Sequence, residues 1–455
     1  MLSFLSWFLI FNLLYHIFTT LTVYGLELWA TTLPSLLRET IWCGFLAIIF
    51  LLNIKQWKSY RKKWGKSWLA FGGLLVFSVL ISYFLQHKGF SDIFIGIKYG
   101  FWWMFILLSA SSIGFFYREK FMNLNLHTRL KRGLIATVII GFLRQGLKLW
   151  KPDLFAHIGY ELKLDDFHFG EKPPIYYLTG YEGKLRWQGL FAWPNNYGYF
   201  LVAFFPLILL FFGITPLHKS TQRGFRNELL HNIKSLTLFQ WFNIGMLTLR
   251  ILAMVMSLSR AVLLGGVLAL VITNRSFFKQ HKKLLLRGGI GCLGVLLLLS
   301  LMKRQSTIGH LTSKLAAFPH IINQPLGYGL GTSWPAIHHN GTILPENYYF
   351  QIMLDVGTIG FLLRAVVMFQ LIKIQRQITT PFMKGGWRGV LSEQEQILYL
   401  IFNRIQIWFL VLLCIGLVLH VFEDSMVNYL FFIVYGILLG SLSTPWSSSS
   451  RYKAP

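Results

Sequence analysis

Residues 3–24 read SFLSWFLIFNLLYHIFTTLTVY and contain no Asp, Glu, Lys or Arg. An α-helix rises about 1.5 Å per residue, so a run of this length is long enough to cross the hydrocarbon core of a bilayer. The segment lacks a basic leader and a small-residue cleavage site, which favours a retained span over a cleaved signal peptide. We therefore expect a membrane-spanning helix here.

Similar apolar runs recur along the 455 residues. Hydrophobic residues make up 54% of the chain and charged residues only 13%, whereas a soluble domain has about 25% charged residues. This composition excludes a soluble enzyme, a secreted disulfide scaffold and a disordered chain. The candidate spans are residues 3–24, 38–54, 67–86, 95–116, 133–150, 196–213, 236–257, 259–273, 288–302, 347–372, 405–421 and 427–441. We predict an all-α, polytopic membrane helix bundle of about twelve spans.

The basic residues predict how this bundle is oriented. The chain has a formal net charge of +26, and the cytoplasmic loops of membrane proteins collect Lys and Arg. The strongly basic stretch KQWKSYRKK at residues 55–63 is therefore placed inside. Alternation from there puts residues 117–132, 214–235, 274–287 and 373–404 on the same side, with both termini and the cytoplasmic tail 442–455. The positive charge thus indicates membrane topology, and we expect no nucleic-acid partner.

Two predicted outer segments, residues 151–195 and 303–346, are too long to be simple turns. Loops of this length in a compact protein are usually functional or disordered. Both are rich in Trp, Tyr, Pro, His and Gly, which argues against disorder. We expect them to fold over the outer face and to divide the chain into transmembrane bundles 1–150, 196–302 and 347–441.

The first outer loop ends in a motif built around Arg186. A single Arg at a membrane surface is commonly an interface anchor. Here Gly189, Pro194 and Asn195 predict a shaped turn, which could aim the guanidinium group at a bidentate oxyanion such as phosphate.

Two further cations are placed near the same face. Arg260 follows Ser259 in a very short connection between predicted spans. It is either a snorkelling side chain or a second phosphate-binding cation. Arg144 lies near the outer end of the predicted span 133–150 and could add to the same pocket.

The second outer loop contains Gly327, Gly329 and Gly331, which predict a tight backbone turn that also allows a ligand to approach closely. Glu346 lies where the next span begins. It is either a helix cap, favourable for the helix dipole, or a general base beside an aromatic surface. The spacing of the histidines in this loop does not match a helical metal site, and we expect no metal.

On these residues the chain resembles the O-antigen ligase and O-antigen polymerase superfamily of bacterial membrane glycosyltransferases. The match covers about residues 180–365, and the remainder matches by span count only. The matching positions, in family order, are Arg186, Gly189, Pro194 and Asn195; Ser259 and Arg260; Pro325, Leu326, Gly327 and Gly329; Pro345, Glu346, Asn347 and Tyr349; and Gly357 and Gly360.

One position departs from the family pattern. Glu346 stands where the ligases of the family have His, which favours a polymerase-like member. Alternatively, His338 or His339 takes that role from a shifted position. The resemblance implies an enzyme of the bacterial plasma membrane, active at its outer face on a polyprenyl-diphosphate-linked oligosaccharide, with no metal or other cofactor.

The resemblance also implies residue roles. Arg186 and Arg260 would neutralise the diphosphate leaving group, and Glu346 would accept the proton of the attacking hydroxyl. Substrate binding is expected from Arg144, Asn195, Trp187, His338, His339, Asn347 and Tyr348. Membrane lipid, a flippase and a chain-length regulator are the implied partners. The alternatives are a ligase that transfers the glycan to a lipid or protein acceptor, and a transporter or flippase for the same lipid-linked glycan.

Overall fold

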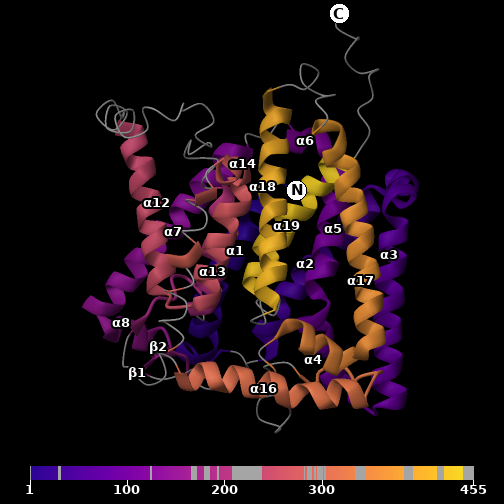
Figure 1. Cartoon of the computed structure of the whole chain (residues 1–455), viewed down its shortest axis with the longest axis horizontal. Coiled ribbons are helices and arrows are strands. Elements are labelled where there is room, and N and C mark those ends of the chain that lie inside the picture. Colours follow the sequence, from indigo (N-terminus) through magenta and orange to yellow (C-terminus); the bar gives the residue numbers. More distant parts are fainter. Residues whose placement is uncertain are drawn as a thin grey trace, which may run out of the picture.

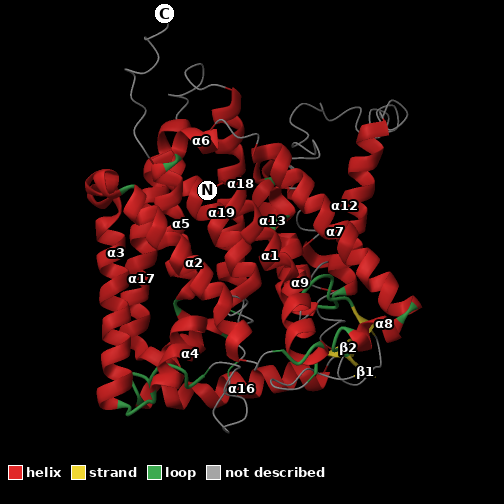
Figure 2. Cartoon of the chain, turned by 180° about the vertical axis from the view of Figure 1, so that it is seen from behind, coloured by secondary structure: helices red, strands yellow, loops and turns green. Residues whose placement is uncertain are grey.

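The computed structural model describes residues 2–28, 32–122, 126–164, 172–178, 185–191, 194–207, 238–280, 304–333, 347–383, 393–417 and 425–443, with a few isolated positions between them. Helices dominate the described residues, and strands occur only beside α8 (Figure 2). The N-terminal elements are α1 (Leu2–Thr20), the π-helical turn η1 (Leu21–Gly25), α2 (Thr32–Leu52), the 3₁₀ turn η2 (Ile54–Gln56), α3 (Trp57–Leu80), the π-helical turn η3 (Ile81–Leu85), α4 (Phe90–Gly100), α5 (Trp102–Phe116), α6 (Arg118–Met122), α7 (Leu126–Trp150) and α8 (Pro152–His157).

The C-terminal part continues with three short strands and a second set of helices. These are β1 (Glu161–Leu164), β2 (Pro174–Leu178), β3 (Leu185–Arg186), α9 (Pro194–Ala203), α12 (Leu238–Met256), α13 (Arg260–Thr273), α14 (Arg275–Gln280), α16 (Arg304–Asn323), α17 (Tyr348–Met383), α18 (Glu393–Gly416) and α19 (Ser425–Ser443). Most of the long helices run along one common direction, and α16 lies across them (Figure 1).

The described helices confirm an all-α membrane bundle, but not its predicted size. Five of them are long and apolar enough to cross a membrane: Ser3–Gly25, Ile54–Leu85, Thr128–Trp150, Tyr348–Ile378 and Glu395–Gly416. A bent pair, α4 and α5, would make a sixth. The predicted count of about twelve spans is therefore not reached within the described residues. Some apolar runs form helices too short to cross alone, such as α13 with 14 residues, and the run 288–302 falls mostly outside the described residues.

The predicted span 95–116 is broken in the middle. Helices α4 and α5 meet at Phe101 with a bend of 59°. The bend exposes carbonyl groups at the end of α4, which need new partners in an apolar surrounding. Arg364 of α17 supplies one, because its Nη2 donates to the Gly100 carbonyl at 2.6 Å. The apolar run 95–116 therefore contains two helices, α4 and α5, and the buried Arg364 bonds to the carbonyl where they meet.

Small residues bring α5 and α19 into close contact. A side-chain carbon at Gly114 would lie 2.0 Å from the Ile437 carbonyl oxygen, and one at Gly440 would lie 2.0 Å from the Ser111 oxygen. The Ser441 hydroxyl donates to the Gly114 carbonyl at 3.0 Å. Small residues that let helix backbones approach each other are the typical glue of membrane bundles. This pair forms part of the rigid centre around which the other helices pack.

The described parts of the two predicted outer loops lie at one end of the bundle. Figure 1 shows α8, β1, β2 and α16 at this end, and α6 and α14, from predicted inner loops, at the opposite end. The first loop forms a small sheet of order β1-β2-β3, with β1 and β2 parallel and β2 and β3 antiparallel. We call this end, which carries α8, the sheet and α16, the loop end.

The second loop differs from the prediction, because its first half is a 20-residue helix, α16. Ala317 and Ile321 of this helix are buried against Leu354 of α17. Apolar residues recur along α16 at spacings of three and four, which is a helical period that a search for long apolar runs does not detect.

Candidate active site at the loop end

Arg186 is fixed between three elements of the loop end. It ends β3, its Nε donates to the Ser257 carbonyl after α12 at 3.0 Å, and its Nη2 donates to Oδ1 of Asn195 in α9 at 2.7 Å. Its side chain is half-buried. Because the guanidinium group is planar and rigid, these two bonds set the direction of its whole fork of donors.

Arg260 stands in the same corner. The turn Ser257–Ser259 joins α12 to α13, and Arg260 is the first residue of α13. Its Nη1 donates to the Thr307 hydroxyl in the first turns of α16. Arg186 thus bonds to the carbonyl only three residues before Arg260, so the two motifs that are separate in the sequence meet at the turn between α12 and α13.

The Arg144 guanidinium group is held by protein oxygens near the loop end of α7. It is buried, its Nη1 donates to the carbonyls of Gly189 and Phe191, and its Nη2 donates to the Tyr160 hydroxyl at 2.5 Å. Both terminal nitrogens of its guanidinium group therefore donate to protein oxygens, two of which belong to the loop 185–191. These contacts help to shape the loop 185–191, and substrate binding by Arg144 stays a prediction.

Lys148 lies one helical turn further along α7 and is also buried. Its Nζ donates to the Ile175 carbonyl of β2 at 2.7 Å, and the Tyr176 hydroxyl donates to the Lys148 carbonyl. Partial burial raises the pKa of the Tyr176 phenol, which keeps it protonated as a donor. Lys148 and Arg144 are therefore held, among the described residues, by neutral oxygen acceptors.

The turn after Arg186 requires glycine. Gly189 has φ of +51°, a backbone region that side chains disfavour. A side-chain carbon at this position would lie 2.4 Å from Cε2 of Tyr197. The Gly189 carbonyl is the acceptor for Arg144. The turn predicted from sequence is thus present, and it is held by Arg144 from one side and Tyr197 from the other.

Trp187 connects the loop to two helices. Its backbone N–H donates to the Met256 carbonyl at 3.0 Å. Its ring packs edge-on against Phe142 of α7, with 4.8 Å between the ring centroids. It lies next to Arg186 in the chain, and its half-buried ring faces α7.

The glycine-rich segment 325–333 forms the predicted tight turn, with positive φ at Gly327, Gly329 and Gly331. Asp355 of α17 closes it: the carboxylate accepts from the Gly331 and Ser333 N–H groups and the Ser333 hydroxyl, at 3.0, 2.9 and 2.8 Å. A side chain at Gly331 would meet the Asp92 carbonyl oxygen at 2.3 Å. Because neighbouring backbone fills this space, the turn packs against protein at Gly331 and leaves no room for a ligand there.

The same segment enters a break in α17. Gly357 has φ of +69° inside this helix, and a side-chain carbon there would lie 2.0 Å from the Pro325 carbonyl oxygen. The Tyr328 and Gly329 N–H groups donate to the carbonyls of Leu354 and Asp355. The loop backbone is therefore hydrogen-bonded by the helix that it interrupts.

Asn347 caps α17, because its Oδ1 accepts from the N–H groups of Tyr349 and Phe350 at 2.9 and 3.1 Å. Tyr348 is buried, and its hydroxyl accepts from Trp103 Nε1 at 2.7 Å and from Arg364. Both side chains serve the fold at these contacts, and no observation places either against a substrate. Three further predicted site residues, Glu346, His338 and His339, lie outside the described residues.

The start of α17 is connected to Arg260 through α18. Asn347 Nδ2 donates to the Leu417 carbonyl at 2.8 Å, just after α18 ends. Ile415 in the last turn of α18 packs against Gly265, which is about one and a half turns beyond Arg260. The residue that follows Glu346 in sequence therefore belongs to the same end of the bundle as Arg260.

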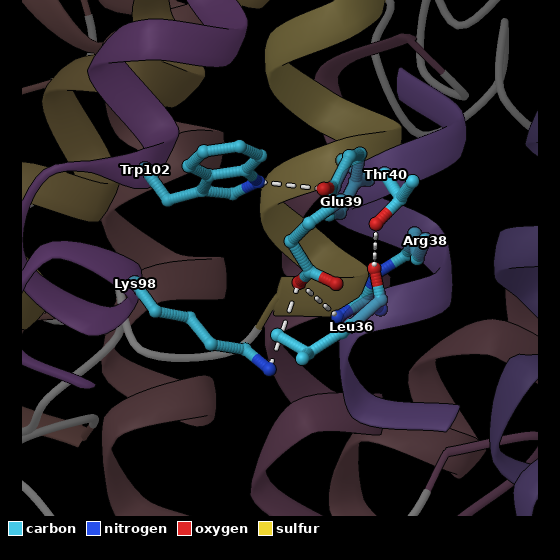
Figure 3. Close-up of polar contacts among 7 residues, drawn as sticks. Leu36, Arg38, Glu39, Thr40, Lys98 and Trp102 are labelled. Carbon is cyan, nitrogen blue, oxygen red and sulfur yellow. Dashed lines mark hydrogen bonds and ion pairs between the residues drawn. The ribbon is translucent and has the colours of Figure 1, made fainter. Parts of the chain in front are cut away.

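One buried ionic cluster contains two residues, Arg38 and Glu39, that were not singled out from sequence. Glu39 Oε1 lies 3.3 Å from Arg38 Nη2 and 3.7 Å from Lys98 Nζ, and Figure 3 shows the two cations approaching the same carboxylate. The Arg38 guanidinium also stacks over the rings of Tyr15 and Tyr429. Arg38 and Glu39 lie inside α2, which begins at Thr32, whereas the span was predicted to begin at residue 38. The signal was an acidic residue next to a basic one at the start of an apolar run.

No protein-family model and no curated protein matches this chain. The resemblance to the O-antigen ligase and polymerase superfamily therefore rests on the short sequence motifs alone. Among the described residues no group of His, Cys, Asp and Glu could hold a metal ion.

Proposed function

We propose that this protein is a membrane glycosyltransferase that polymerises polyprenyl-diphosphate-linked oligosaccharide units into a surface polysaccharide. The observation that carries the proposal is the corner shared by Arg186 and Arg260, where Arg186 bonds to the carbonyl three residues before Arg260. Two oriented cations in a half-buried site suit a diphosphate, whose release is the main electrostatic demand of this reaction.

The reaction needs no external oxidant or reductant. An acceptor sugar hydroxyl attacks the anomeric carbon of the donor, a new carbon–oxygen bond forms, and the bond from that carbon to the diphosphate oxygen breaks. The polyprenyl diphosphate leaves with the bonding electron pair, stabilised by Arg186 and Arg260. The hydroxyl proton passes to a general base.

Glu346 is the residue that we propose as this base. Asn347 already provides the helix cap of α17, so the capping role that competed for Glu346 is filled by its neighbour. Asn347 is also tied to the end of α18, which packs against the helix that Arg260 starts. A carboxylate in place of the ligase His at this position supports polymerisation over transfer to a separate acceptor.

We further propose that the loop end faces the outside of a bacterial plasma membrane. The strongly basic segment 55–63 supports this orientation, since it is expected to face the cytoplasm. The donor would then reach the site from the outer leaflet.

Arg186→Gln and Arg260→Gln test the proposal in producing cells. Both changes remove a charge and keep a polar side chain, and both should abolish the polymer while the protein stays in the membrane. Arg129→Gln is the matched control, because Arg129 is exposed on α7 well away from the loop end. Normal polymer in either site variant, or equal loss in the control, would contradict the proposal.

A further inference from the structure

Helix α16 carries an apolar stripe on its exposed surface. Five large apolar side chains recur at spacings of three and four residues, and each is between 48% and 63% exposed: Ile308, Leu311, Leu315, Phe318 and Ile322. Side chains at this spacing line one face of a helix. A different face of α16 is covered, because Ala317 and Ile321 pack against Leu354 of α17. The stripe itself is left uncovered by the described part of the chain.

The exposed surface of α16 is divided along its length. Beside the apolar stripe, the exposed positions hold small or polar residues: Gly309, Thr312, Ala316, Pro319 and Asn323. With 3.6 residues per turn, the centre of this second strip lies about 100° around the helix axis from the centre of the apolar stripe. A helix with such a boundary is suited to lie where hydrocarbon meets water.

The position of α16 places it where the spanning helices end. Figure 1 shows α16 running across the long helices, level with the end of α3, and Figure 2 shows the same arrangement from behind. Its first turns are bonded through Thr307 to Arg260, the first residue of α13. The turn that follows α16 packs at Gly329 against Lys88, just beyond the candidate span Ile54–Leu85. Both ends of α16 are therefore held beside the ends of apolar helices.

The bilayer surface is the partner that fits this geometry. Helix α16 is not among the candidate spans of the described residues, and it lies across those spans, so it is parallel to the plane of a membrane that they cross. At the ends of spanning helices the surroundings change from hydrocarbon to polar headgroups. The two exposed strips of α16 match these two surroundings.

We infer that α16 is an interfacial helix that binds the phospholipid bilayer at the loop end, with its apolar stripe at the boundary between headgroups and acyl chains. This inference does not depend on the proposed function. The helix is joined to Arg260 at one end, and at the other His320 Nδ1 lies 3.0 Å from the hydroxyl of Tyr328 in the glycine-rich turn. Membrane binding by α16 would therefore anchor the described part of the second loop.

Photocrosslinking of the full-length protein tests this contact. Benzoylphenylalanine replaces either Leu315 in the stripe or Thr312 in the polar strip, with the protein in vesicles of phosphatidylcholine and phosphatidylglycerol. The same group at Leu69, which is exposed within the span Ile54–Leu85, is the positive reference. We expect several-fold more phospholipid adduct at position 315 than at position 312. A yield at 315 no higher than at 312, or a crosslink from 315 to a second copy of the chain, would overturn the inference.

Hydrogen exchange in the same vesicles provides a second measurement. The double variant Leu311→Gln, Leu315→Gln makes the stripe polar with little change in helix propensity. Release of α16 from the bilayer should then speed amide exchange across residues 304–323. The control variant Thr312→Gln, Ala316→Gln changes the polar strip and should leave exchange unaltered. Exchange that is unchanged in the stripe variant, or equally faster in both variants, would overturn the inference.

Discussion

Nη2 of Arg186 lies 2.7 Å from Oδ1 of Asn195, which joins the end of β3 to the first turn of α9. The acceptor is an amide, so it orients the guanidinium group without neutralising its charge. A second neutral acceptor, the Ser257 carbonyl, fixes Nε of the same group at 3.0 Å. These two contacts orient the Arg186 guanidinium group through neutral acceptors.

Substitution of Asn195 tests whether the hydrogen-bond acceptor of Arg186 must be uncharged for activity. In Asn195→Ala the Arg186 group keeps its bond to Ser257, and we expect polymerase activity to fall about tenfold, the equivalent of about 1.4 kcal/mol. In Asn195→Asp the acceptor remains but forms an ion pair with Arg186 and repels the diphosphate. The Asp variant should therefore be less active than the Ala variant. If the Asp variant is the more active of the two, Asn195 serves only to hold the loop.

Gly189→Ala should destabilise the protein. The new methyl group would meet the Tyr197 ring and sit on a backbone with φ of +51°, and we expect a loss of about 2–4 kcal/mol. Thermal unfolding in detergent measures this loss. Gly133→Ala is the control, since its site is open and the change should be neutral or slightly stabilising. Equal melting temperatures for the two variants would refute the packing described for the turn.

Asp355→Asn should open the glycine-rich turn. The carboxylate accepts three hydrogen bonds from Gly331 and Ser333, and an amide group cannot accept all three in the same geometry. We expect a loss of about 2–4 kcal/mol in unfolding free energy, because buried donors lose a charged acceptor. Faster proteolysis between residues 325 and 333 would report the same opening. Asp153→Asn, at an exposed position, should change neither property.

The features that the sequence predicts well are those determined within a single segment of the chain. The run 3–24 forms α1 and η1 because its apolar length alone favours a spanning helix. Gly327, Gly329 and Gly331 adopt positive φ, as their spacing predicted. In both cases the signal lies within one segment, so no knowledge of distant neighbours is needed.

Other features depend on contacts between distant segments. Arg144 was predicted near the outer end of its span, but its hydrogen bond to the Gly189 carbonyl, 45 residues away, was not predicted. The break at Phe101 is stabilised by Arg364 of α17, and a single apolar run gives no sign of it. Which way a buried cation points is decided by the packing of several helices, and a local pattern does not contain that information.

The buried cluster of Glu39 with Arg38 and Lys98 should contribute to the free energy of unfolding. Glu39→Gln leaves Arg38 and Lys98 without their carboxylate, and breaking such a pair costs about 3–5 kcal/mol. The double variant Glu39→Gln, Lys98→Met removes one of the stranded charges, so it should be more stable than the single variant. Thermal unfolding of both proteins checks this order. A single variant as stable as the unaltered protein would show that the cluster is already well solvated.

The central claim is polymerisation at the corner of Arg186 and Arg260. The most direct measurement uses purified protein in detergent with one defined polyprenyl-diphosphate oligosaccharide, and resolves the products by repeat number. We predict a ladder of increasing repeats, which Arg186→Gln and Arg260→Gln do not produce. A donor that stays intact, or that is consumed only when a separate lipid or peptide acceptor is added, would contradict the account.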